Sequence, residues 1–316
     1  MAEAAGQLAT RVHLELSRVI VGQEEIIDQL LAVWLVGGHA LLEGVPGIAK
    51  TLIVKALAGL CRLEFQRIQC TPDLMPGDIL GVNVYNTATG VFSFRRGPVF
   101  TDLLLLDEIN RMPPRSQAAL LECMEERQVT LDGTRYPLSE FFTAIATENP
   151  VEFEGTYPLP EAQLDRFLAK IRIGYPGPDE EVEILSRYQN GFDPHRLDRL
   201  GLAVIETDLL VAARRDAASV KVEATLFRYV GELVRRTRNW PALSLGGSPR
   251  ASVALLLMAK SLAAMDGRDY LLPDDVKAAA PVVLRHRLVV KPEADLEGIT
   301  SDRVVSEIIA AVEVPH

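Results

Sequence analysis

The segment EGVPGIAKT, residues 43–51, carries residue types that bind phosphate. The common phosphate-loop pattern G-x-x-x-x-G-K-S/T has its second glycine directly before the lysine. Here Gly44 and Lys50 are in place, but Ala49 occupies the position of the second glycine. In this pattern Lys50 would reach the β and γ phosphates of a nucleotide, and the Thr51 hydroxyl would bind Mg²⁺. The alternative is a turn between a strand and a helix that happens to contain a lysine.

The flanking sequence places this loop where a strand ends and a helix begins, since apolar HALL precedes it and KTLIVKALAGL follows. Unpaired N–H groups and the helix dipole favour a phosphate there, and Gly44 and Gly47 let the backbone curve around it. A non-glycine residue at positive φ is uncommon, so we expect Ala49 to adopt ordinary helical or turn dihedrals. The predicted nucleotide contacts in this loop are Gly44, Val45, Pro46, Gly47, Ile48, Ala49, Lys50, Thr51 and Leu52.

A second group of candidate residues follows four leucines in LLLLDE, which ends in Asp107 and Glu108. Four consecutive leucines indicate a buried strand, and ligands of parallel sheets collect at the carboxyl ends of the strands. Asp107 would hold Mg²⁺ through water, and Glu108 would polarise the attacking water in phosphoryl transfer. The alternative is that both carboxylates cap the next helix. Together with the loop, the pair favours Mg²⁺-dependent nucleotide hydrolysis.

The elements around these residues divide the chain into two parts. Strands and helices alternate in the first part, which is typical of a parallel sheet covered by helices. The predicted strands are 39–42, 64–69, 99–106, 141–147 and 169–173, and the predicted helices of this part are 24–36, 50–61 and 115–127. A stretch rich in Gly and Pro, 174–181, then predicts a linker. Helices are predicted beyond it at 179–188, 208–214, 223–238, 249–265, 273–287 and 302–312. We therefore expect an α/β domain, 1–178, and a helical domain, 179–316.

Composition narrows the class of protein. The net charge of −10 argues against a main partner that is nucleic acid, because such binding relies on Lys and Arg that neutralise phosphates. The three cysteines are far apart, which predicts neither disulfides nor a zinc site. The longest charge-free stretch near the start, Gln29 to Leu42, is 14 residues, too short to span a membrane. With its polar opening, the sequence predicts a cytoplasmic protein.

Six motifs, in order, resemble the MoxR group of AAA+ ATPases: EGVPGIAKT, LLLLDEINR, ALLECMEERQVTLDG, ATENP, YPLPEAQLDRF and GGSPRA. The resemblance covers nearly the whole chain, and this family commonly has Ala before the lysine, as at Ala49. It implies a P-loop AAA+ core with a central parallel five-stranded sheet, followed by an all-α lid domain. It also implies ATP, ADP and Mg²⁺ as ligands, and a ring of identical subunits, expected to be a hexamer.

The resemblance assigns roles to further polar residues. Asn149 matches sensor 1, which helps to place the water or the γ-phosphate; the alternative is a turn residue before a proline. Arg166 matches the arginine finger, which reaches the nucleotide of a neighbouring subunit. The alternatives are that Arg166 is a partner of Asp165, or that Arg111 is a competing or additional trans-acting arginine.

Two other positions match the family's nucleotide contacts. Arg250 follows a predicted N-cap, Ser248, and matches sensor 2, which would contact the γ-phosphate from the helical domain; the alternative is a surface arginine. Residues 19–23, including Val21 and Gln23, resemble the segment that lines the adenine pocket.

Two predicted hairpins interrupt the core. Residues 81–97 alternate polar and apolar side chains about a turn, and residues 128–138 contain an Asp-Gly turn signal. In the helix-2-insert clade, which includes the MoxR proteins that the chain resembles, hairpins at these two positions can face the central pore or the partner. We expect exposed Phe92, Phe94 and Arg95 to contact the client; the alternative is a simple extension of the sheet.

The predicted function is ATP-driven, chaperone-like remodelling of client proteins by a ring. The resemblance suggests clients with von Willebrand factor A domains, or metal-cofactor enzymes that await activation. One alternative is an AAA+ motor that acts on nucleic acid. A second is an ATP-regulated, chelatase-like subunit with slow hydrolysis.

Overall fold

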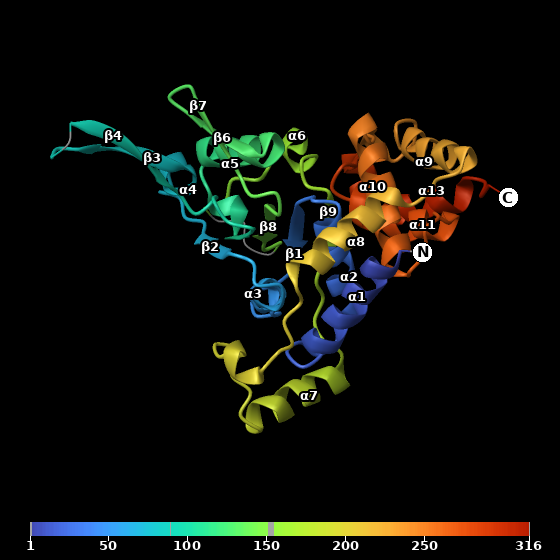
Figure 1. Ribbon diagram of the computed structural model, residues 1–316. Coiled ribbons are helices and arrows are strands. Elements are labelled where there is room, and N and C mark those ends of the chain that lie inside the picture. The colour runs from blue at the N-terminus through green and yellow to red at the C-terminus, as the bar shows by residue number, and fades with distance from the viewer. Residues whose placement is uncertain (1, 89, 151–154, 316) are drawn as a thin grey trace.

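The computed structural model describes residues 2–88, 90–150 and 155–315. A parallel sheet of five strands forms its centre, in the order β2-β5-β8-β1-β9 (Figure 1). These strands are β1 (Ala40–Glu43), β2 (Phe65–Gln69), β5 (Leu103–Asp107), β8 (Thr143–Glu148) and β9 (Ala169–Arg172). The predicted fold class, a five-stranded parallel sheet flanked by helices and followed by a helical region, is confirmed. The strand predicted at 99–106 is shorter than expected, since turns precede Leu103.

The register of the strands brings polar residues to one edge of the sheet. Glu43 lies beside Glu148, and Gln69 lies beside Asp107. All of these residues end their strands, because parallel strands finish at the same edge. The sheet therefore collects carboxylates and an amide at its carboxyl edge.

Leucines of β5 fill both faces of the sheet. Leu103 and Leu105 belong to one apolar cluster, which includes residues of α1, α2, α3 and the helices of the second half. Leu104 and Leu106 belong to the other, which includes residues of α5. Successive side chains of a strand point to opposite faces of the sheet, which explains this division. Both faces of β5 are buried, so apolar residues occupy four consecutive positions.

Each predicted helix is present, with its ends shifted by a few residues. The helices are α1 (Glu3–Leu16), α2 (Glu24–Leu35), α3 (Lys50–Leu60), α4 (Pro76–Leu80), α5 (Pro114–Glu126), α6 (Glu161–Leu164), α7 (Pro178–Gln189), α8 (Thr207–Ser219), α9 (Ala224–Thr237), α10 (Pro249–Met265), α11 (Pro273–Leu284), α12 (Pro292–Leu296) and α13 (Ser301–Ala311). The helix predicted to reach residue 287 ends at Leu284. A small antiparallel sheet, β10 (Leu243–Leu245) and β11 (Val289–Val290), lies among the later helices.

Helix α1 was not predicted from the sequence. It packs against α8 and α10, which lie far along the chain. The carboxylate of Asp216 in α8 accepts hydrogen bonds from the N–H groups of Ala4 and Ala5, so it satisfies donors at the start of α1. The first helix is thereby fixed to the helices of the second half.

Both predicted hairpins are present and extend from the core (Figure 1). Strands β3 (Gly81–Asn86) and β4 (Val91–Arg96) form one, and β6 (Gln128–Leu131) and β7 (Thr134–Pro137) form the other. The predicted turn from Asn86 to Gly90 includes residue 89, which lies outside the described residues.

The expectation that Phe94 is exposed was wrong. Its ring stacks on Tyr136 of the other hairpin, with 4.2 Å between ring centroids, and is half-buried. Phe92 has the expected exposure, at 66%, and its ring lies 5.0 Å from that of Tyr85. An inter-hairpin contact therefore accounts for Phe94, and Phe92 remains on the surface near the tip.

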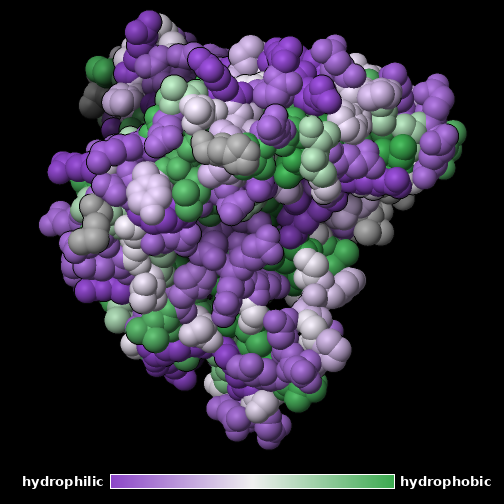
Figure 2. Space-filling view, turned by 90° about the vertical axis from the view of Figure 1, so that its right-hand side faces the viewer, coloured by the Kyte–Doolittle hydropathy of each residue, from purple (hydrophilic) through white to green (hydrophobic). Residues whose placement is uncertain are grey.

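Figure 2 shows the side of the molecule that lies to the right in Figure 1, where the later helices gather. This face is mainly hydrophilic, with hydrophobic residues in small separate groups, as is ordinary for a folded protein. Within the described ranges, the helices are all too short or too polar to cross a lipid bilayer.

Candidate nucleotide-binding site

Two adjoining cavities surround the loop between β1 and α3. One has a volume of about 330 Å³ and the other of about 400 Å³. Both are lined by Pro46, Gly47, Ala49, Leu52 and Tyr188. They therefore form one elongated site that the loop divides into two halves.

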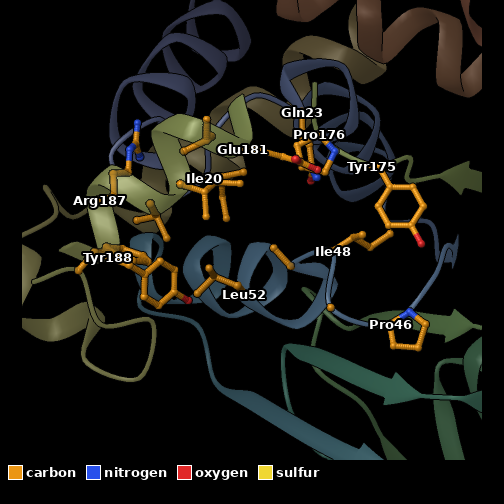
Figure 3. A pocket seen from close by; sticks show the side chains of 16 residues that line it. Ile20, Gln23, Pro46, Ile48, Leu52, Tyr175, Pro176, Glu181, Arg187 and Tyr188 are labelled. Atoms are coloured by element: carbon orange, nitrogen blue, oxygen red, sulfur yellow. The ribbon is translucent and has the colours of Figure 1, made fainter. Parts of the chain in front are cut away.

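The smaller cavity is mostly apolar and lies between α3 and α7 (Figure 3). Val21 and Gln23 line it, and Figure 3 shows Leu52 and Tyr188 toward one end and Tyr175 toward the other. The buried Oε1 atom of Gln23 has no hydrogen-bond partner among the described residues. An apolar slot with an amide acceptor suits a flat heterocycle that carries an amine.

Sequence reasoning missed the contribution of α7 to this cavity. Ile184, Arg187 and Tyr188 of α7 line it, although the helix contains no fully buried residue. The available signal was an apolar stripe on a helix that directly follows a Gly- and Pro-rich linker.

The larger cavity is polar and contains the residues of the two sequence motifs. Lys50 and Thr51 from the loop line it, as do Asp107 and Glu108 from the end of β5, and Asn149 beyond β8. The residues of this cavity that sequence reasoning missed are Arg67, Gln69, Thr147, Tyr188 and Pro194. A cation, a hydroxyl, two carboxylates and an amide thus converge where phosphates and their counter-ion would lie.

Close packing explains the first glycine of the loop. A Cβ atom at Gly44 would lie 2.4 Å from Cδ1 of Ile48 and 2.8 Å from the carbonyl oxygen of Ile173. At Gly47 the cause is different, since open space surrounds it but φ is +86°. Gly44 and Val45 begin the loop without lining either cavity.

The expectation of ordinary dihedrals at Ala49 was wrong. This residue is the N-cap of α3, with φ 63° and ψ 16°, which is the left-handed region. The loop must reverse here to start the helix, and alanine tolerates this conformation at a penalty of about 1–2 kcal/mol. The glycine of the common pattern avoids that penalty, so Ala49 stores backbone strain beside the polar cavity.

Lys50 is held in place by backbone oxygens. Its Nζ donates to the carbonyl oxygens of Gly44, at 2.5 Å, and of Glu148, at 3.5 Å. Burial lowers the pKa of Lys50, and the nearby carboxylates Asp107, Glu108 and Glu148 oppose that shift. The net pKa of Lys50 is lowered, and its side chain lines the polar cavity.

Both carboxylates at the end of β5 have basic partners. Oδ2 of Asp107 accepts a charge-assisted hydrogen bond from Nε of Arg67 at 2.5 Å. Oε2 of Glu108 lies 2.9 Å from Nε of Arg111 and 3.5 Å from Nε2 of Gln69. Glu108 itself is in the left-handed region, at φ 59° and ψ 56°. Its N–H donates to the hydroxyl of Thr147 at 2.9 Å, which fixes the strained turn.

An ion-pair network lies beside the loop. Nζ of Lys170 is 2.5 Å from a carboxylate oxygen of Glu43 and 2.5 Å from one of Glu148. Burial raises the pKa of Glu43, but Lys170 and Arg172 outweigh it, and the net pKa is lowered. Burial lowers the pKa of Lys170, but Glu148 and Glu43 outweigh it, and the net pKa is raised. Lys170 therefore joins the end of β1, where the loop to α3 starts, to the end of β8 as a charged group.

The residues present fit a magnesium ion that is shared with a nucleotide. Thr51 and Asp107 supply a hydroxyl and a carboxylate in one cavity, which are the hard oxygen donors that Mg²⁺ prefers. Among the described residues, no cluster of three His, Cys, Asp or Glu side chains could hold a metal alone. Mg²⁺ is commonly bound by one or two protein oxygens together with substrate phosphates, and this donor set matches that pattern.

Arg166 and Arg250 meet at a different place. Nε of Arg166 lies 3.1 Å from Oε2 of Glu125 in α5, and Arg250 of α10 lies 2.5 Å from Oε1 of the same carboxylate. Neither arginine lines the two cavities described above, and neither does Arg111. Two guanidinium groups thus share one carboxylate on a partly exposed surface.

Neighbouring residues position these two arginines. Asp165 pairs with the buried Arg287 at 2.7 Å, not with Arg166, so that alternative was wrong. Ser248 is the N-cap of α10 as predicted, but its hydroxyl donates to Asp165 at 3.0 Å and not to its own helix. The core and α10 are therefore joined through Asp165.

The chain is similar to known proteins along most of its length. Residues 39–169 match the family described as ATPase family associated with various cellular activities (AAA), and residues 235–308 match the AAA lid domain. The chain is 46% identical to Uncharacterized protein YeaC of Bacillus subtilis, over 95% of this chain and 92% of that protein. It is 42% identical to Chaperone MoxR1 of Mycobacterium tuberculosis, over 98% of this chain and 84% of that protein. A solved structure from Cytophaga hutchinsonii, described as a candidate ATPase, has a TM-score of 0.88 and 40% identity, and covers 99% of this chain and 98% of that one.

Proposed function

Because the chain belongs to the MoxR family of AAA+ ATPases, we propose that it hydrolyses ATP with Mg²⁺ in a ring and uses the energy to remodel client proteins. One observation carries the proposal. The phosphate loop and the carboxylates that end β5 open into the same cavity, next to an apolar slot of a size that suits a nucleobase.

The residues of this cavity have separate roles in the proposed reaction. Lys50 would neutralise the β and γ phosphates, and Thr51 and Asp107 would hold Mg²⁺, which would supply positive charge to offset the charge that develops on the phosphates. Glu108 accepts a hydrogen bond from the attacking water and takes its proton. Asn149 orients that water or the γ-phosphate. The oxygen of the attacking water bonds to the γ-phosphorus, and the bond between that phosphorus and the bridging oxygen breaks.

The apolar slot is the proposed adenine site. Val21, Ile20 and Leu52 contact the faces of the base, and the buried Gln23 Oε1 accepts a hydrogen bond from its amine. The base is then fixed at one side of the loop and the phosphates at the other.

Arg166 and Arg250 are proposed to act on the nucleotide of a neighbouring subunit. They lie together on the surface, away from the cavities of their own chain, and they carry one positive charge more than the carboxylate of Glu125 that they share. Such a pair suits the extra negative charge of a γ-phosphate that is presented by another subunit. A closed ring, proposed to be a hexamer, satisfies every site in this way. Arg111 pairs with Glu108 in its own chain, and Arg166 is the preferred finger.

The proposed clients are proteins, including proteins with von Willebrand factor A domains, and the proposed location is the cytoplasm. A similar protein is named a chaperone, and Phe92, exposed at 66% near the tip of a projecting hairpin, offers a contact. We also propose a core of residues 1–178 and a lid of residues 179–316. Deleting residues 86–90 should abolish effects on a client and leave basal ATPase activity. If the deletion left both the effects on a client and the basal ATPase activity intact, a client role for this hairpin would be contradicted.

The direct test of the chemistry is Glu108→Gln. This variant keeps the shape of the site but removes the proton acceptor, so turnover should fall about 10²–10⁴-fold while ATP still binds. The matched control is Glu122→Gln, on the exposed side of α5, which should behave as the wild type. Turnover by Glu108→Gln at the wild-type rate would refute the proposed mechanism.

A further inference from the structure

Arg67 lines the polar cavity next to Asp107, the proposed ligand of Mg²⁺. It extends from β2, whose neighbour in the sheet is β5, and its Nε donates to Oδ2 of Asp107 at 2.5 Å. The other oxygen of this carboxylate accepts from the hydroxyl of Thr147 at 3.3 Å. Both oxygens of Asp107 are therefore engaged, and Arg67 supplies the positive charge.

The two members of this ion pair differ in their freedom to move. The side chain of Asp107 is 10% exposed, at the end of a buried strand, whereas that of Arg67 is 51% exposed. Among the described residues, Arg67 also donates a hydrogen bond of 3.3 Å to Gln69 on its own strand. Asp107 is thus fixed, and Arg67 can leave at little energetic expense.

Arg67 lines the same cavity as Lys50 and Thr51. A hydrated Mg²⁺ bound between Thr51 and Asp107 would have to approach the carboxylate from that cavity. Two cations on one carboxylate repel each other, so Arg67 and the ion compete for Asp107. In the absence of metal, the guanidinium compensates the charge of a nearly buried carboxylate, which would otherwise be unpaired.

We propose that Arg67 is a competitor of Mg²⁺ at Asp107, a positioning residue that sets the concentration of Mg²⁺ at which the nucleotide site becomes loaded. This inference rests on the proposed function, because it takes the cavity to be a site for Mg²⁺ and ATP. In the metal-free site Arg67 pairs with Asp107, and it would move aside when Mg²⁺ binds.

The test is a magnesium titration of nucleotide binding, followed with a fluorescent methylanthraniloyl derivative of ATP. Arg67→Gln removes the competing charge, so the Mg²⁺ concentration at half-maximal response should fall about fivefold, as expected for the loss of a half-exposed ion pair. Arg67→Lys keeps a positive charge and should stay close to the wild type. Arg115→Gln, an exposed arginine in the first turn of α5, is the control.

Three results separate the possibilities. A midpoint for Arg67→Gln that is unchanged or higher would overturn the inference. Equal shifts in Arg67→Gln and Arg67→Lys would also overturn it, since charge would not be the cause. Absence of any Mg²⁺-dependent binding by the wild type would instead refute the proposed function of the cavity.

Discussion

Replacing Ala49 by glycine tests whether the loop between β1 and α3 is strained. Ala49 has φ 63° and ψ 16°, a conformation that imposes about 1–2 kcal/mol on a residue with a Cβ atom. Glycine removes this penalty but gains freedom in the unfolded chain, which destabilises the fold by about 0.5–1 kcal/mol. We therefore expect Ala49→Gly to be neutral or slightly stabilising.

A second alanine-to-glycine substitution, at a residue with helical dihedrals, separates the free energy of the backbone strain at Ala49 from the other effects of glycine. Ala212 lies inside α8 and is half-buried, as Ala49 is, but it has helical dihedrals. Ala212→Gly should lose about 1 kcal/mol. The entropy of the unfolded chain changes equally in both variants, so their free energies of unfolding should differ by about 1–2 kcal/mol, in favour of Ala49→Gly.

Urea unfolding without nucleotide measures this difference. The wild type and both variants are compared at one temperature and protein concentration. If Ala49→Gly lost as much stability as Ala212→Gly, the reasoning about the strained loop would be refuted.

Three further predictions concern the framework of the site. Lys170→Met leaves two carboxylates without their shared cation, and urea unfolding should show a loss of about 3 kcal/mol, whereas the exposed control Lys291→Met should show little change. Burial lowers the pKa of His39 from 6.5 to about 4. As the pH falls, His39 is therefore protonated in the unfolded chain before it is protonated in the folded protein. The stability that is present above pH 6.5 is lost as the pH falls toward 4. His39 should contribute a loss of about 2 kcal/mol between pH 7 and pH 5; His39→Gln should reduce this slope, and exposed His195→Gln should not. Gly44→Ala places a methyl carbon 2.8 Å from a backbone oxygen, so ATP binding in a fluorescence titration should weaken strongly; unchanged affinity would contradict the packing argument.

Short-range patterns predicted much of the fold. The four leucines before Asp107 predicted a strand buried on both faces, and the loop from Gly44 to Thr51 was correctly placed between a strand and a helix. These features depend on neighbours in sequence, which is why periodicity and spacing reveal them. Helix α1 was not predicted, because its buried face is built partly of alanines, such as Ala5 and Ala9. The hydrophobicity of alanine differs only weakly from that of polar residues, so the periodic pattern is faint.

Contacts between distant segments could not be predicted. Nothing in the sequence around Arg67 indicates that it meets Asp107, because that contact depends on the order of strands in the sheet. The same applies to Glu125, which brings Arg166 and Arg250 together from separate elements. Local sequence thus predicted the chemical groups that line the candidate site, whereas tertiary packing determined their partners.

We propose that ATP is hydrolysed between subunits, with Lys50 from one subunit and Arg166 from the next. Lys50→Ala and Arg166→Ala should each be inactive alone. When they are mixed in equal amounts, about one quarter of the interfaces should combine an intact phosphate site with an intact arginine, and ATPase activity should return in that proportion. A mixture that stays as inactive as its components would contradict the account.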